Sequence, residues 1–360
     1  MIKVLVTCAD YPHDDVHPMQ YAHVRNLYYV ENEIEVEVLN FSVNNNYIYE
    51  GINVISYNYF KSNSSKYSNY VLLCHAPNIR NHFLFLKKYQ NIFRKVIFIF
   101  HGHEIVKLND VYSKPYDFKR KSIIKNKFQD LYDSFKLHIW KKYFKKNNDL
   151  IMIFVSNSLY MDFLRYTKIK SEDLLNDIYI INNAVGKVFE QNKYNNSIEK
   201  EYDFITIRSD LDNSIYCVEL INEFAKKNTD CNFLLIGKGE YFNHNNKAIN
   251  ITWINRQMNQ EELMHYIDIS KYALMPTRRD SQGLMACELA TYGINVITSD
   301  LDVCHEMFDG FNNVKLLSEP EILELDINEL NFSYNNCNEK FYSINTMKME
   351  VEIIRGVVSE

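Results

Sequence analysis

The feature of this sequence that most constrains its fold is a series of short, almost continuous apolar runs. In the first half they lie at 2–7, 52–57, 70–76, 95–101, 150–156 and 178–185. Runs of this length are typical of strands buried on both faces, and helical periodicity between them favours a parallel sheet covered by helices on each side. The first half therefore predicts a doubly wound α/β domain.

The same rhythm restarts after a polar stretch, "EQNKYNNSIEKE", with runs at 203–209, 232–237, 250–254, 272–277 and 295–299. The sequence thus predicts an α/β protein with two Rossmann-like doubly wound domains facing across a cleft, in which ligands bind at the carboxyl ends of the strands. The predicted parts are an N-terminal domain at 1–189, a linker at 190–201, a C-terminal domain at 202–335 and a helical tail at 336–360. Whether that tail packs back across the two domains stays open.

Composition narrows the class of protein. A chain of 360 residues with 46% hydrophobic content suits two folded domains. A net charge of −6 argues against a general nucleic-acid binder. We expect a cytoplasmic protein, because no signal-like opening and no apolar run of ~18 residues occur, and the seven cysteines form no CxxC pair.

One stretch, "RRDSQGLMACELATYGINVITSD" at 278–300, combines features of a ligand site. It follows the predicted strand at 272–277, so its first residues form a loop at a strand's carboxyl end. We expect a helix after that loop, with Asp280 or Ser281 as its N-cap and Gly293 as its stop.

The start of this predicted helix suits an oxygen-rich anion. Its first backbone N–H groups lack helical acceptors and suit phosphate or sugar oxygens, and Gly283 lets a ligand approach the backbone closely. Glu288 lies on an otherwise apolar helix, where an unpaired carboxylate is costly to bury. We therefore expect Glu288 to bind a hydrogen-bonding partner, with ligand hydroxyls as a candidate.

From Asp280 onward the chain gives D-S-Q-G-L-M-A-C-E-L-A-T-Y-G-I-N-V-I. This resembles, in register, the E-G-F-G-L-x-x-x-E-A-x-A-x-G-x-P-V-I pattern, with its E-x7-E signature, of retaining glycosyltransferases of the GT-B fold, family 4. The resemblance extends to most of the chain through "FITIRSD", "LLIGKGE", "IINNAVGKVF" and "FHGHE". It implies catalytic or donor-binding roles for His101, Arg208, Asp280, Ser281, Gly283, Leu284 and Glu288.

The individual roles also follow from the resemblance. Glu288 would hold the ribose hydroxyls of a nucleotide, and Asp280 would contact the donor sugar. Arg208 and the N–H groups at the start of the helix would stabilise the leaving diphosphate. His101 would contact the sugar or position the acceptor.

The sequence departs from the family pattern at three places. Asp280 stands where the family has glutamate, and Asn213 stands where it has a lysine at the diphosphate site. The stretch "ADYPHDDVHPMQ" replaces the glycine-rich loop that usually follows the first strand. These departures leave the donor geometry and full catalytic competence open.

The resemblance implies transfer of a sugar, with retention, from a nucleotide-sugar donor to a glycan or lipid-linked saccharide. Capsule, O-antigen or other surface polysaccharide synthesis would be the pathway, without cofactor or metal. Two alternatives stay open: a nucleotide-sugar epimerase on the same fold, and a catalytically decayed sugar- or membrane-binding protein.

Two patterns raise the alternative of a metal site. His101 and His103 flank a glycine, and a D-x-D motif occurs at 210–212 and again at 300–302. A D-x-D after a strand can hold a cation on a diphosphate. No further ligands cluster near the histidines in the sequence, and two copies of D-x-D cannot both be diagnostic, so we predict no metal.

A basic segment at 114–146 holds eleven lysines and arginines against three aspartates, interleaved with aromatic residues. A solvated helical face is one interpretation. The other is a peripheral surface for anionic lipid at the inner face of the plasma membrane, with Lys141, Lys142, Lys145 and Lys146 as candidates. Nucleic acid fits less well, because the rest of the chain is acidic.

Overall fold

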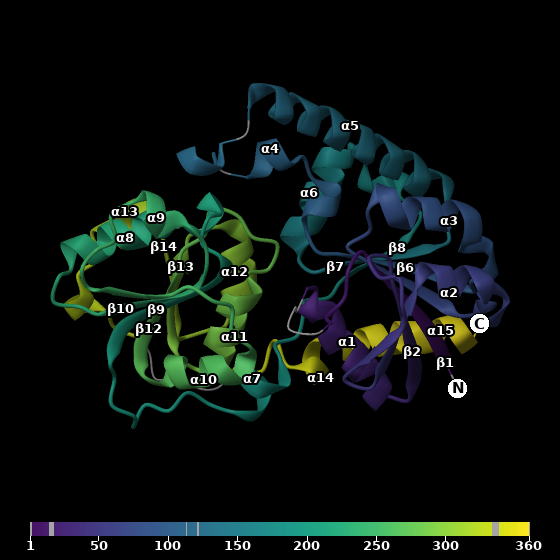
Figure 1. The fold of residues 1–360 in the computed structure, drawn as a ribbon. Coiled ribbons are helices and arrows are strands. Elements are labelled where there is room, and N and C mark those ends of the chain that lie inside the picture. Colours follow the sequence, from purple (N-terminus) through teal and green to yellow (C-terminus); the bar gives the residue numbers. More distant parts are fainter. Residues whose placement is uncertain (1, 14–17, 113, 121, 333–337, 360) are drawn as a thin grey trace. The chain divides into compact units, whose positions relative to one another are not determined.

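The computed structural model describes residues 2–13, 18–112, 114–120, 122–332 and 338–359. The chain divides into two compact units (Figure 1). The first unit consists of Met1–Leu108, Phe128–Ala184 and Ser343–Glu360, and the second of Asn109–Lys127 and Val185–Tyr342.

The first unit is built on an eight-stranded sheet of order β3-β4-β2-β1-β5-β6-β7-β8. Neighbouring strands pair in parallel except β3 with β4. The strands are β1 (Ile2–Cys8), β2 (Ile34–Asn40), β3 (Tyr47–Tyr49), β4 (Ile52–Ser56), β5 (Val71–His75), β6 (Lys95–Phe100), β7 (Leu150–Phe154) and β8 (Asp177–Ile180). The order reverses between β1 and β5, which is the switch point of this sheet.

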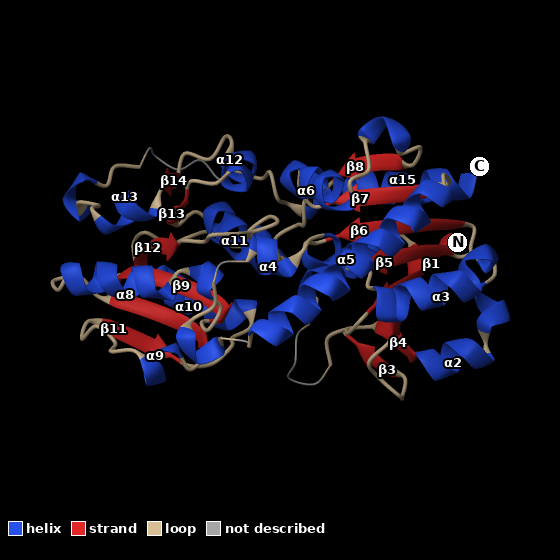
Figure 2. Ribbon diagram, turned by 90° about the horizontal axis from the view of Figure 1, so that it is seen from above, coloured by secondary structure: helices blue, strands red, loops and turns tan. Residues whose placement is uncertain are grey.

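Helices cover both faces of this sheet (Figure 2). They are α1 (Gln20–Glu31), α2 (Tyr57–Ser62), α3 (Leu84–Tyr89), α5 (Ile123–Lys146) from Phe128 onward, α6 (Asn157–Thr167), α14 (Ser343–Thr346) and α15 (Lys348–Ser359). The short helix α4 (Leu108–Val111) begins at the last residue of the first unit's opening segment and continues in the second unit. Successive β6 side chains face opposite ways. Ile97 packs in one cluster with residues of α1 and α15, whereas Phe98 packs on Trp140 and Phe144 of α5.

The second unit has a six-stranded, wholly parallel sheet of order β11-β10-β9-β12-β13-β14. Its strands are β9 (Tyr202–Asp210), β10 (Phe233–Lys238), β11 (Ile251–Ile254), β12 (Ser270–Met275), β13 (Asn295–Ser299) and β14 (Val314–Leu317). Its other helices are α7 (Lys187–Gln191), α8 (Val218–Lys227), α9 (Tyr241–His244), α10 (Gln260–Asp268), α11 (Leu284–Tyr292), α12 (Asp302–Phe308) and α13 (Glu319–Leu323). The prediction of two parallel doubly wound sheets is therefore confirmed.

The units differ from the predicted domain boundaries in three places. Residues 109–127, predicted in the first domain, belong to the second unit. The predicted linker at 190–201 also belongs there, because Tyr194 donates its hydroxyl hydrogen to the Ser270 carbonyl at 2.5 Å and Lys200 bonds the Asp268 carbonyl at 2.6 Å. The last helices, from Ser343, belong to the first unit, whereas the predicted start of the tail at 336 lies outside the described residues.

Arg25, fully buried in α1, fixes the C-terminal helix α15 to the first unit. Its Nε donates to the Glu350 carboxylate at 2.9 and 3.1 Å, and its guanidinium also bonds Asn183. The hydroxyl of Tyr29 donates to the same carboxylate. Periodicity predicts this helix, but these contacts decide which sheet it covers.

Three strands are absent from the sequence prediction: β2, β3 and β14. β2 reads "IEVEVLN", and its alternating glutamates obscure an otherwise apolar run. Glu37 is buried in this strand because the Tyr67 hydroxyl donates to it at 2.7 Å and the Lys66 ammonium pairs with it. A charged position is thus compatible with a central strand when its partners come from a distant turn.

Candidate functional site

The switch point of the second sheet lies between β9 and β12, where the strand order reverses. In open parallel sheets, ligands bind outside the carboxyl ends of strands at such a point. Arg208 lies near the carboxyl end of β9, and the loop that contains Asp280 follows β12. The fold therefore brings these two predicted residues to the same edge of one sheet.

Arg208 is only 8% exposed. Its Nη2 donates to the carbonyls of Met275 and Pro276 at 2.9 and 2.8 Å, and its guanidinium lies 4.6 Å from the centre of the Tyr216 ring. Its buried Nε has no hydrogen-bond partner among the described residues. Burial lowers the pKa of Arg208, and the nearby Tyr216 and Asp280 act in the opposite direction. A buried guanidinium with an unused donor is a site for an anionic oxygen.

The loop after β12 is organised by Asp280. Its Oδ1 accepts hydrogen bonds from the backbone N–H groups of Ser281, Gln282 and Gly283 at 2.8, 3.3 and 2.6 Å. The helix does not begin here, so the prediction of Asp280 or Ser281 as its N-cap is wrong. The carboxylate instead closes the tight turn that precedes the helix, as short acidic side chains often do.

The helix α11 begins at Leu284, one residue after Gly283, which adopts a left-handed φ of 74° as the N-cap. Among the described residues, no side chain caps this helix end. Its first N–H groups therefore lack a capping side chain, which favours an anion at this place. At the other end, Gly293 has a left-handed φ of 111°, which confirms it as the helix stop.

Glu288 is 4% exposed within α11, so the predicted buried acid is present. Its Oε1 accepts a hydrogen bond of 2.7 Å from the Gln260 amide, and the Gly186 backbone N–H also donates to its carboxylate. Burial raises the pKa of Glu288 to about 8, although both hydrogen bonds favour the charged form. Burial therefore favours the protonated form of this carboxyl at neutral pH in the free protein.

Gln260 is a candidate site residue that the sequence reasoning missed. It is the first residue of α10, next to a capping box formed by Asn259 and Glu262. Its amide lies so close to Gly186 that a Cβ on that glycine would meet the Gln260 Oε1 at 1.9 Å. A helix N-terminus is readable from sequence, but its contact with Glu288, 28 residues away, is set by the sheet.

Asn213, which replaces the family lysine, has a structural role. Its Oδ1 accepts a hydrogen bond from the Ile215 N–H at 3.3 Å and caps the short 3-10 turn Ser214–Tyr216. The position therefore supplies no cation, and Arg208 is the positive side chain that the structure brings to this edge from β9.

In the first unit, His101 follows β6, and His75 ends β5. The His101 Nε2 lies 3.1 Å from the His75 Nδ1, and the Tyr21 ring lies 4.0 Å from the His101 ring. Burial lowers the pKa of both histidines well below the usual value, so both are neutral at pH 7. The His101 Nδ1 is buried without a partner among the described residues. His75 is a second residue that sequence reasoning missed.

The D-x-D motifs, which raised the alternative of a metal site, have other partners in the structure. Asp212 of the first D-x-D accepts a hydrogen bond of 2.7 Å from the Glu240 N–H and pairs with Lys119 at 3.0 Å. Asp300 of the second pairs with His305 at 2.5 Å. Within the part of the chain that the structure describes, no group of three or more potential ligands is arranged to hold a metal ion.

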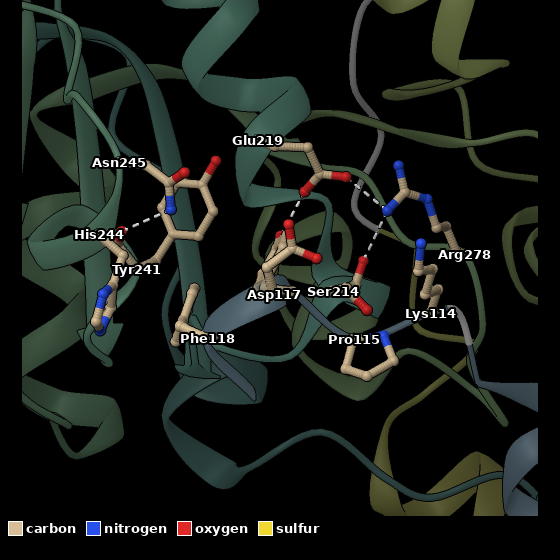
Figure 3. A pocket seen from close by; sticks show the side chains of 11 residues that line it. Lys114, Pro115, Asp117, Phe118, Ser214, Glu219, Tyr241, His244, Asn245 and Arg278 are labelled. Carbon is tan, nitrogen blue, oxygen red and sulfur yellow. Dashed lines mark hydrogen bonds and ion pairs between the residues drawn. The ribbon is translucent and has the colours of Figure 1, made fainter. Parts of the chain in front are cut away.

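A pocket in the second unit is lined by residues 114–118 and by side chains from α8, α9 and the switch-point loops (Figure 3). Tyr116 accepts a hydrogen bond from the Val218 N–H at 3.2 Å and donates to Glu219, while Phe118 stacks on His244. Arg278 pairs with Glu219 at 2.6 Å across the pocket. The sequence reasoning placed residues 114–118 in the basic segment and did not predict this packing.

The four lysines predicted to face a membrane differ in their surroundings. Lys141 is half-buried and donates to the Lys168 carbonyl at 2.6 Å, and Lys145 pairs with Asp173 at 3.1 Å. Lys142 and Lys146 are exposed. Lys141 is thus partly committed to an internal contact. No helix among the described residues combines the length and the apolar character needed to cross a membrane.

Neither a protein-family model nor a curated protein matches the sequence. Solved structures do match the fold. A sucrose-phosphate synthase from Thermosynechococcus elongatus is 13% identical, with a TM-score of 0.66 over 90% of this chain and 88% of that chain. A UDP-forming α,α-trehalose-phosphate synthase from Burkholderia vietnamiensis is 10% identical, with a TM-score of 0.64 over 99% of each chain. WaaG, a glycosyltransferase involved in lipopolysaccharide biosynthesis, is 10% identical, with a TM-score of 0.56 over 99% of this chain and 90% of that chain.

Likeness at such low identity establishes the fold. The two parallel sheets, each with a switch point, and the match to these enzymes over most of the chain define the protein as one of GT-B architecture. The predicted fold class is thereby confirmed.

Proposed function

We propose that this protein is a retaining glycosyltransferase that moves a sugar from a nucleotide-sugar donor to a glycan or lipid-linked saccharide. The observation that carries the proposal is the buried Arg208, whose Nε has no hydrogen-bond partner among the described residues. Arg208 lies at the same sheet edge as the loop that opens α11. A donor diphosphate has the charge and the oxygen acceptors that such a site lacks.

The diphosphate would lie between Arg208 and the start of α11. The first N–H groups of that helix, from Leu284 onward, would donate to phosphate oxygens as the bond to the sugar breaks, while Gly283, whose N–H is held by Asp280, would let the diphosphate approach the backbone closely. Asp280 would hold the turn in shape through its three backbone hydrogen bonds, and the donor sugar would be contacted from this turn, which includes Ser281. These fixed donors would take the place of a cation, so no metal enters the proposal.

Glu288 would bind the ribose hydroxyls of the donor. In the absence of ligand its carboxyl accepts hydrogen bonds from Gln260 and Gly186. Two ribose hydroxyls would add donors to the same carboxyl and favour its ionised form. Gln260 would thus be the neighbour that positions Glu288 before the nucleotide arrives.

The acceptor would be held by the first unit. His101 is neutral, and its Nδ1 has no partner among the described residues. This uncharged ring nitrogen can therefore form a hydrogen bond with an acceptor hydroxyl. A surface polysaccharide pathway such as capsule or O-antigen synthesis is our proposal for the setting, at the cytoplasmic face of the membrane. WaaG, one of the similar structures, serves lipopolysaccharide biosynthesis.

The proposal is tested by thermal unfolding with UDP-, GDP-, dTDP-, ADP- and CMP-sugars, each with and without EDTA. A ligand that binds only the folded state raises the midpoint by mass action. We expect one nucleotide class to stabilise the protein regardless of EDTA, with UDP-sugars first because one similar enzyme is UDP-forming. Loss of stabilisation in EDTA would contradict metal independence, and an epimerised donor formed without acceptor would identify an epimerase. If no nucleotide sugar raises the unfolding midpoint, the proposed donor site is contradicted.

The Glu288→Gln variant tests the ribose contact. We expect donor binding to weaken by about 1–3 kcal/mol, the range for hydrogen bonds to charged groups, as measured by titration calorimetry. Glu261→Gln is the matched control, because Glu261 is exposed on α10 beside Gln260. Equal affinity of the folded Glu288→Gln variant and wild type would remove Glu288 from the donor site.

A further inference from the structure

The helix α5 exposes a row of large apolar side chains to solvent. Ile124, Phe128, Leu131 and Phe135 are 67, 67, 66 and 58% exposed. Their spacings of four, three and four residues place them on one face of the helix. We call these four residues the apolar stripe. Single exposed apolar residues are ordinary, but a contiguous row on one helix indicates an interaction surface.

The orientation of this helix is fixed by its opposite face. Trp140 and Phe144 are fully buried and pack on Phe98 of the sheet. Asp133 is buried as well, where it accepts a hydrogen bond from the Leu108 N–H at 2.8 Å. The apolar stripe therefore faces solvent because the other side of α5 is anchored in the core. Figures 1 and 2 show the course of this helix.

The face that carries the apolar stripe continues into positive charge. Lys142 lies seven residues after Phe135, and Lys146 four residues further, so both extend the same row; Lys127 lies beside it, and all three are exposed. The whole helix has seven lysines against two aspartates, and one of those aspartates is the buried Asp133. Apolar side chains and lysines on one surface are complementary to a bilayer with anionic headgroups.

We propose that the apolar stripe and the lysines that extend it form a docking surface for an anionic lipid membrane. The apolar side chains lie among the headgroups and upper acyl chains, while Lys127, Lys142 and Lys146 meet lipid phosphates. A second copy of this chain is a less suitable partner, because the lysines of two copies of α5 would face each other and repel. This inference rests on the proposed function, because docking on a membrane would bring the enzyme to a lipid-linked acceptor.

Vesicle sedimentation tests the docking surface without donor or acceptor. We expect wild type to bind vesicles of equimolar phosphatidylglycerol and phosphatidylcholine, and to bind pure phosphatidylcholine about tenfold more weakly. The Phe128→Ser/Leu131→Ser variant should lose about tenfold in affinity for the anionic vesicles. The Lys142→Glu/Lys146→Glu variant should bind the anionic vesicles more weakly than wild type at low salt. At high salt the difference between the two proteins should shrink, because salt screens the lysine–phosphate attraction. The matched control is Leu84→Ser/Leu175→Ser, which alters two equally exposed leucines of the same unit.

A second measurement keeps the test valid if a serine variant unfolds. A tryptophan introduced as Phe128→Trp should shift its emission to the blue when anionic vesicles are added, whereas Leu175→Trp should not. Unchanged vesicle binding of the folded stripe variant would overturn the proposal. So would a dimer in sedimentation analysis that the stripe variant abolishes while vesicle binding persists. Because no nucleotide is present, failure here is separate from failure of the donor-binding test.

Discussion

At the scale of single residues, the candidate donor site depends on polar groups held where water is excluded. Arg208 is retained there by the carbonyls of Met275 and Pro276, and Glu288 by Gln260 and Gly186. Each group has hydrogen-bond partners in the free protein, and these bonds offset the cost of burying it. Each group can still form a further hydrogen bond to a ligand. These polar groups are thus held in place in the free protein.

The raised pKa of Glu288 predicts a pH dependence of stability. Its folded value of about 8 lies above the ordinary 4.5, so the stability contributed by its protonated form is complete below pH 4.5 and is lost as the pH rises through 8. Glu288→Gln should remove this slope and be more stable than wild type above pH 8, by about 5 kcal/mol, because each pH unit between 4.5 and 8 contributes about 1.4 kcal/mol. Urea unfolding of both proteins across this range measures it. Parallel stability curves would contradict the prediction.

At the scale of elements, the C-terminal helix α15 is joined to the first unit by apolar packing of Val351, Ile354 and Val357 and by one buried ion pair. Arg25 and Glu350 are both fully or almost fully buried, and Tyr29 donates to the same carboxylate. Buried pairs are weak evidence for net stability, but removal of one partner leaves the other charge uncompensated. The helix is therefore held by a contact that tolerates few substitutions.

Glu350→Gln is expected to destabilise the protein by about 3–5 kcal/mol, because the Arg25 charge remains buried without its counterion. The free energy of unfolding in urea gives the value. Glu352→Gln, two residues along the same helix and exposed, serves as the control and should change stability by less than about 0.5 kcal/mol. Similar effects of the two substitutions would mean that the ion pair does not hold α15.

At the scale of the whole molecule, the protein consists of two units with separate cores. The chain passes between them four times, at 108/109, 127/128, 184/185 and 342/343. The segment from 109 to 127 leaves the first unit after β6 and packs on the second through Tyr116 and Phe118. Each unit therefore has its own sheet and its own core.

This division predicts where a nucleotide sugar acts. At a hundred times its dissociation constant, the donor should stabilise the protein by about 2.7 kcal/mol. Hydrogen exchange should slow mainly at the ends of β9 and β12 and in the first turn of α11, all in the second unit. Mass spectrometry of exchanging peptides measures this. Protection confined to peptides of the first unit would contradict the donor site.

The sequence by itself determined the alternation of strands and helices, the two sheets and the motif from Asp280 to Gly293. These depend on the apolar character, glycines and polar turns of neighbouring residues, which local patterns record. Tertiary structure alone decided that Gln260 contacts Glu288, that His75 contacts His101, that β2 buries Glu37 and that residues 109–127 join the second unit. Each of these is a contact between residues far apart in the chain, and such contacts depend on strand order and packing, for which no local pattern exists.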